Sequence, residues 1–79
     1  MMHLICMNRL LGVGFIINDF GMLYVIDAPH QPRPSKAEDM ERCVKYLGYA
    51  CMNQSFPDVA SVTNYIRFEY EQAVLPKTT

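Results

Sequence analysis

The chain carries little charge. Only 19% of its 79 residues are Asp, Glu, Lys or Arg, and the formal net charge is −1. So weak a field excludes long-range attraction to nucleic acid or to an anionic membrane. Hydrophobic residues make up 51% of the sequence, which excludes intrinsic disorder, because disordered chains combine low hydrophobicity with high charge. The composition therefore predicts one folded domain over residues 1–79.

A long apolar run is missing too. The apolar segment 4–17 is interrupted by Asn8 and Arg9, and it is shorter than the ~20 residues that a membrane-spanning helix needs. No basic region precedes it, and no cleavage signal follows it. The sequence holds three cysteines and no CxxC pair; the three are Cys6, Cys43 and Cys51. Three reduced thiols suit a reducing compartment, so we expect a cytoplasmic protein that has no membrane partner.

Motifs that carry enzyme chemistry are also lacking. Asp19-Phe20-Gly21 spells the magnesium motif of protein kinases, but the other kinase motifs need a far longer chain. Gly12-Val13-Gly14 lacks the third glycine of a dinucleotide-binding fingerprint. The histidines have no partner at metal-ligand spacing, and only a site assembled through space from His3, Cys6 and His30 would suit zinc. We therefore predict no catalytic residue, metal, cofactor or small-molecule substrate.

What the sequence does contain is a hairpin signal within residues 14–27. Residues 18–21, Asn-Asp-Phe-Gly, are typical of a turn, because Asn and Asp side chains cap backbone amides and glycine accepts a positive φ. The flanks, 13–17 and 22–26, are rich in β-branched and aromatic residues, as strands are. Residues 2–7 offer a third strand. The proline-rich segment 28–34 then predicts an extended linker.

Two helices are predicted after the linker. A capping box at residues 35–38 and apolar spacing predict a first helix over 35–53. Ser55, Pro57 and Asp58 predict a second helix over 56–75, antiparallel to the first because the connection is short. The expected fold class is α+β, with an N-terminal antiparallel β-hairpin of two or three strands followed by two antiparallel α-helices. On one helix Cys43 and Cys51 would lie about 12 Å apart, too far for a disulfide, whereas a bond from Cys6 to either of them stays geometrically open.

Apolar residues remain where this fold would leave them uncovered. Two helices can cover one face of the hairpin, and aromatic side chains also point outward from both helices. Exposed apolar patches of this kind mark interfaces, and strand edges template partner strands. The predicted protein interface comprises Ile16, Met22, Tyr24, Tyr46, Tyr49, Tyr65 and Phe68.

The expected function is that of a non-enzymatic protein-interaction module. It would bind or occlude another protein, or form a homodimer, and its size suits a small inhibitor or adaptor of the kind that mobile elements encode. The alternative is a small nucleic-acid-binding or regulatory protein that uses the two-helix unit as a dimer. Its contacts would come from Arg42, Lys45, Asn64 and Arg67. Seven basic residues offset by eight acids weaken this alternative.

Overall fold

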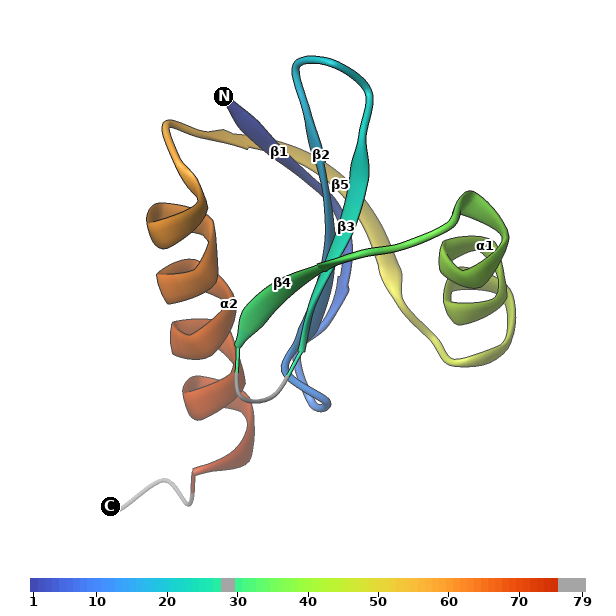
Figure 1. Cartoon of the computed structure of the whole chain (residues 1–79). Helices are drawn as coiled ribbons and strands as arrows, with labels where there is room; N and C mark the ends of the chain where they lie inside the picture. Colours follow the sequence, from blue (N-terminus) through green and yellow to red (C-terminus); the bar gives the residue numbers. More distant parts are fainter. Residues whose placement is uncertain (28–29, 76–79) are drawn as a thin grey trace.

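The chain folds into a five-stranded antiparallel sheet with one helix on each face (Figure 1). The computed structural model describes residues 1–27 and 30–75. The strands lie in the order β4-β3-β2-β1-β5. In chain order the elements are β1 (Met2–Asn8), β2 (Val13–Asn18), β3 (Leu23–Asp27), β4 (Gln31–Pro34), α1 (Ala37–Tyr46), β5 (Ala50–Phe56) and α2 (Val59–Val74).

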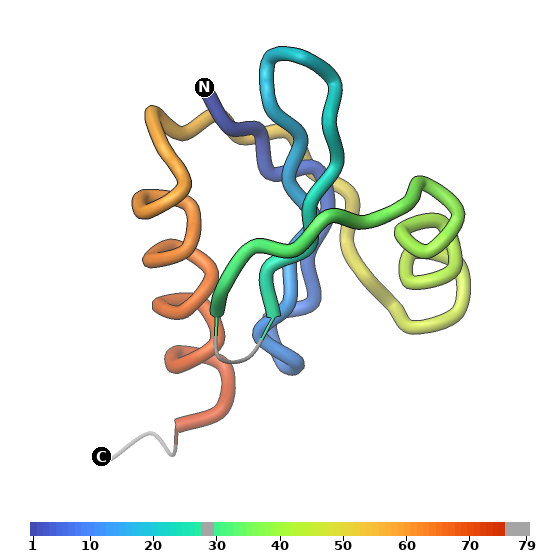
Figure 2. The backbone as a smooth tube through the Cα atoms, viewed as in Figure 1, coloured from blue at the N-terminus to red at the C-terminus, as the bar shows by residue number. Residues whose placement is uncertain are grey.

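The two helices cover opposite faces of the sheet to different extents. Helix α2 packs Val62 and Ile66 into the main core, where they meet Leu4, Ile16 and Ile26 from the sheet. Helix α1 lies on the other side of the sheet (Figure 2), and none of its ten residues, all of them described, is fully buried; Met40, Cys43 and Val44 pack partly buried against that face. A smaller cluster lies on that face; its buried members are Cys6, Phe15, Val25 and Tyr49.

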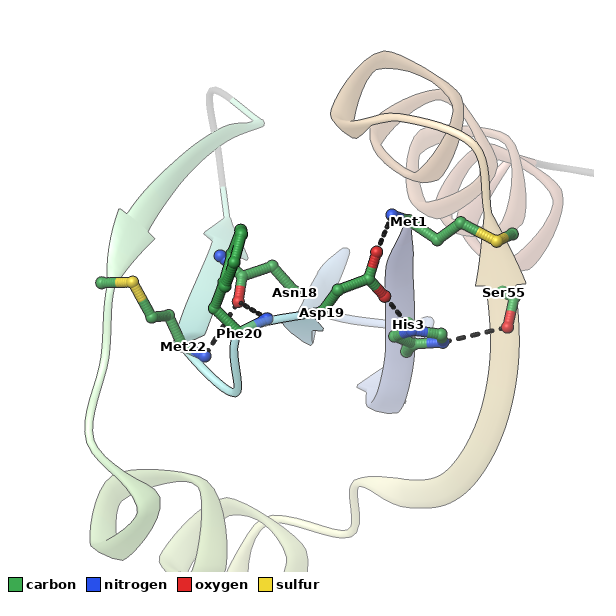
Figure 3. Close-up of polar contacts among 7 residues, drawn as sticks. All are labelled: Met1, His3, Asn18, Asp19, Phe20, Met22 and Ser55. Carbon is green, nitrogen blue, oxygen red and sulfur yellow. Dashed lines mark hydrogen bonds and ion pairs between the residues drawn. The ribbon is translucent and has the colours of Figure 1, made fainter.

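The β2–β3 turn forms as the sequence predicts. The side-chain oxygen of Asn18 accepts hydrogen bonds from the backbone N–H groups of Phe20 and Met22, at 2.9 and 3.0 Å (Figure 3). Gly21 has a φ of 80°, which an L side chain rarely adopts. These local bonds fix the hairpin register in which Ile16 pairs with Tyr24.

The predicted fold class, a hairpin followed by two antiparallel helices, is wrong. A fifth strand, β5, separates the helices and pairs with β1 at the edge of the sheet. The first helix ends at Tyr46, because Gly48 adopts a left-handed φ of 71° and turns the chain into β5. The predicted capping box is not formed either; Lys36 is the N-cap residue of α1, and the Ser35 N–H donates to the Leu23 carbonyl.

The boundaries of the linker and of the second helix also differ from prediction. Gln31–Pro34 is strand β4 and pairs with β3, whereas residues 28 and 29 of the predicted linker lie outside the described residues. Helix α2 begins after Asp58, whose carboxylate accepts from the Ser61 N–H at 2.8 Å. Neither α1 nor α2 is long and apolar enough to cross a membrane, within the described part of the chain.

Candidate functional site

The two edges of the sheet have opposite chemistry. At one edge β4 is only four residues long and reads Gln-Pro-Arg-Pro. Pro32 and Pro34 have no N–H to offer, and Arg33 forms an ion pair with Asp27. Short length, proline and charge are the features by which proteins protect a sheet edge from further pairing. The β4 edge is therefore closed to another strand.

At the other edge β5 is open. It has seven residues, Ala-Cys-Met-Asn-Gln-Ser-Phe, with no charge and no proline. Every second residue of an antiparallel edge strand points its N–H and C=O away from the sheet. One protective feature is present: the register shifts between Leu4 and Cys6, so that Met52 and Asn53 lie opposite Ile5.

A flank of α2 lies along this open edge. The ring of Tyr65 packs against Phe56, the last residue of β5, with 5.3 Å between ring centroids. Phe68 and Gln72 follow Tyr65 by three and seven residues, so all three share one flank of the helix. Phe68 is 58% exposed. We call β5 together with Tyr65, Phe68 and Gln72 the β5–α2 surface.

A groove lies at the Ala50 end of this surface. Its volume is about 690 Å³, and it runs between the β1–β2 turn, the α1–β5 loop and the end of α2. Arg9 reaches Glu69 at 3.9 Å beside it. Both apolar and polar groups line it; they are Met7, Asn8, Arg9, Leu10, Leu47, Gly48, Ala50, Gln72 and Ala73. Leu10 and Leu47 are more than half exposed, so the apolar surface continues from the edge into the groove.

A hydrogen-bonded Ser–His–Asp array, which the sequence analysis did not find, lies near the other end of β5. His3 contacts the Ser55 hydroxyl through Nδ1 at 2.9 Å and the Asp19 carboxylate through Nε2 at 3.1 Å (Figure 3). The Asp19 carboxylate also accepts from the N-terminal amine, and hydrogen bonds from this amine and from His3 lower its pKa. The array links three separate parts of the chain: β1, the β2–β3 turn and β5.

This array lacks the surroundings that a catalytic triad needs. The Asp19 side chain is 57% exposed, so solvent screens it, whereas the acid of an acyl-transfer triad is buried. The groove beside Ala50 and two smaller clefts are lined by other side chains. We therefore read the array as a polar clamp between strands.

Comparison of the chain with protein-family models, with curated proteins and with solved structures gave no match. The site therefore has to be interpreted from its own geometry.

The predicted interface residues are scattered over the molecule. Ile16 and Tyr49 are buried in the chain's own two clusters, so the prediction that they face a partner is corrected. Tyr24 and Tyr65 are half-buried against the main core. The exposed ones, Met22, Tyr46 and Phe68, belong to the β2–β3 turn, the end of α1 and the flank of α2. Of the exposed three, only Phe68 adjoins the open edge.

The four residues of the nucleic-acid alternative do not form one surface. Arg42 and Lys45 lie on α1, and Asn64 and Arg67 lie on α2, on the opposite side of the sheet (Figure 1). The two-helix unit that would have presented them together is absent, because β5 intervenes. The arrangement offers no common basic surface for phosphate contacts.

The zinc alternative has no support among the described side chains. No group of three or more His, Cys, Asp or Glu residues is placed there to hold a metal ion. His30 packs near Tyr70, at 6.2 Å between ring centroids, and not with His3, which is held by Ser55 and Asp19. The open edge itself was not predicted from the sequence, although Gly48, which follows the helical spacing, is a usable signal for the end of a helix.

Proposed function

We propose that the chain is a non-enzymatic protein-interaction module of the cytoplasm that pairs with a second copy of itself through the β5–α2 surface. One observation carries the proposal: the β4 edge is closed by prolines, whereas the β5 edge is long, uncharged and open. An unpaired edge templates a further strand through its N–H and C=O groups. Three free thiols fit the reducing compartment.

Symmetry favours a second copy as the occupant of this edge. When two β5 strands pair antiparallel about a two-fold axis, the sheets join into one, and the two α2 helices lie on the same face. The exposed Phe68 side chains then approach each other from both copies. A single two-fold therefore covers both the open edge and the apolar flank. Because β5 carries no charge, this pairing places no like charges opposite each other.

The register shift within β5 limits how much of the proposed dimer contact the β5 backbone can supply. A bulge disrupts the ladder locally, so the regular part of the strand against β1 is Gln54–Phe56 at one end and Ala50–Cys51 at the other. Backbone pairing alone is then short. The aromatic flank must supply much of the contact, which makes Phe68 the residue to test.

The proposal predicts a dimer that depends on Phe68. In light scattering, the purified chain should approach twice its 9.1 kDa mass as its concentration rises into the high micromolar range. Phe68→Lys should shift the equilibrium toward monomer at least tenfold, because it places a charge at the centre of an apolar contact. Phe20→Lys is the matched control, since Phe20 is 91% exposed at a turn that β1 separates from β5.

Two results would contradict the proposed dimer. A monomer at every concentration would exclude the second copy as the occupant. Equal weakening by the Phe68 and Phe20 substitutions would show that association occurs elsewhere or is non-specific. Circular dichroism of both variants shows whether either has lost its fold.

A further inference from the structure

Two of the three thiols lie directly opposite each other across the β1–β5 ladder. Cys6 on β1 and Cys51 on β5 are Cα partners in this antiparallel pair. Directly opposed residues in such a pair point their side chains to the same face of the sheet. Here that face is the one under α1, because Cys6 belongs to the smaller core cluster with Phe15 and Tyr49.

This placement satisfies the geometry of a disulfide. Opposed Cα atoms of an antiparallel pair lie roughly 4.5–5.5 Å apart, and disulfides bridge Cα atoms about 4.4–6.8 Å apart. Both cysteines are free in the structure. The sequence left a bond from Cys6 to either other cysteine open, and it predicted Cys51 on the helix of Cys43, whereas Cys51 lies on β5.

We propose that Cys6 and Cys51 form an oxidant-sensitive pair, which a low-molecular-weight disulfide such as oxidised glutathione converts into a disulfide between β1 and β5. The inference is independent of the proposed dimer, since both residues belong to one copy. It assigns to the chain a modification site whose reagent is a soluble disulfide.

The difference in exposure between the two thiols sets the order of the steps. Cys51 is exposed, whereas Cys6 is only 1% exposed, so the reagent reaches Cys51 first. The Cys51 thiolate attacks one sulfur of the reagent, forms a mixed disulfide and releases one thiolate, which takes up a proton. Cys6 then loses its proton to solvent, and its thiolate attacks the Cys51 sulfur and displaces the second reagent thiolate. Two protein thiols are oxidised, and one reagent disulfide is reduced to two thiols.

The second step is the slow one. Burial above all, together with the neighbouring Cys51 and Cys43 thiols, raises the pKa of the Cys6 thiol to about 11, and a backbone hydrogen bond from Phe15 acts against this rise. Tyr49, from the loop after α1, is the other titratable side chain that faces Cys6.

Cys43 is the competing partner, and the fold disfavours it. It lies on α1 and is half-buried against the smaller cluster that contains Cys6. Its neighbour is Tyr49, whose pKa is raised to about 12 by burial and by the adjacent Cys43. Cys43 lies on a helix and shares no ladder register with a strand thiol, whereas Cys6 and Cys51 are Cα partners across the β1–β5 pair.

The test is oxidation of the full chain with oxidised glutathione at low micromolar concentration, followed by intact-mass and peptide mapping. We expect loss of two hydrogens in the monomer and one linked peptide pair, Cys6 with Cys51. Cys43→Ala should leave this product unchanged. Cys6→Ala should stop at the glutathione adduct on Cys51, and Cys51→Ser should give no disulfide. Conversion of the mixed disulfide at Cys51 into the Cys6–Cys51 disulfide should become about tenfold faster with each pH unit below the pKa of Cys6, because only the Cys6 thiolate reacts.

Other products would overturn the inference. A persistent glutathione adduct in the unmodified sequence at pH 9 would show that Cys6 cannot reach Cys51. A linked peptide that contains Cys43, or a covalent dimer through Cys51, would show that the disulfide does not form between Cys6 and Cys51 of one chain. If Cys6→Ala proves unfolded, the pH dependence of closure in the unmodified chain still decides the question.

Discussion

At the scale of single residues, Gly14 lies where the main core leaves no room for a side chain. A Cβ atom placed there would lie 2.8 Å from Ile66 Cδ1 and 2.9 Å from Leu4 Cδ1. Both neighbours are fully buried, so neither has free space to enter. We predict that Gly14→Ala lowers the free energy of unfolding by about 1–3 kcal/mol, the usual cost of overpacking a core. Urea denaturation measures this directly.

The same site offers a compensating variant. Ile66→Val removes the Cδ1 atom that the new methyl group meets first. The double variant Gly14→Ala, Ile66→Val should therefore lose less stability than the sum of the two single variants. Strict additivity would contradict a direct clash at this position.

The polar clamp of Asp19 makes stability depend on pH. Hydrogen bonds from the N-terminal amine and from His3 lower its pKa from 3.8. A carboxylate with a lowered folded-state pKa stabilises the fold above its ordinary pKa, and this contribution is lost as the pH falls through the lowered value. The difference in urea midpoint between the chain and Asp19→Asn should be largest near neutral pH and should vanish in strong acid.

Asp39→Asn is the matched control for this measurement. Asp39 is also an exposed aspartate, and its only ion pair among the described residues is with Arg42 at 3.8 Å on the surface of α1. Exposed pairs of this kind contribute little. If Asp19→Asn and Asp39→Asn change the pH dependence of the urea midpoint equally, the hydrogen bonds of Asp19 do not stabilise the fold more than an exposed ion pair does.

At the scale of elements, local chemistry predicted the hairpin but not the whole sheet. The β2–β3 hairpin followed from Asn18 and Gly21, whose side-chain and backbone properties act within four residues. Strand β4 was missed because its two prolines suggest a linker, yet an edge strand tolerates proline. Strand β5 was missed because Ala50 and Cys51 continue the helical spacing of α1, and only long-range pairing with β1 makes this segment a strand.

The candidate site was predictable only in part, because the sequence shows local helical geometry but not which strands pair. Periodicity on α2 placed Tyr65 and Phe68 on one outward flank, since that depends only on helical geometry. Nothing local showed that an open strand edge lies beside them. Ile16 was expected to face a partner because the sequence does not show which helix covers which face of the sheet.

Helix α1 should be the least stable element. None of its residues is fully buried, and Tyr49, which packs against Phe15 at 5.9 Å between ring centroids, anchors the segment that follows it. We predict that Tyr49→Ala speeds amide hydrogen exchange in α1 while α2 keeps its protection, because α2 packs on the other face. Exchange measured by mass spectrometry resolves the two helices. Equal loss of protection in both would show that the two clusters unfold as one unit.

At the scale of the whole molecule, the asymmetry between the sheet edges is the central feature. One edge ends in a short, proline-containing strand with an arginine, and the other in a longer strand without charge or proline. The apolar flank of α2 and the groove at Ala50 lie on the open side. The molecule therefore presents the pairing groups of β5 and the exposed Phe68 side chain in one direction.

The most direct measurement is an isotope-filtered NOE experiment on an equal mixture of labelled and unlabelled chains. Self-pairing through the β5–α2 surface predicts intermolecular contacts between residues of Ala50–Phe56 and between the two Phe68 rings. Asn53→Lys should abolish them by placing like charges near the two-fold axis, and Asn64→Lys, on the solvent side of α2, should not. Intermolecular contacts confined to other residues, or none at millimolar concentration, would contradict the account.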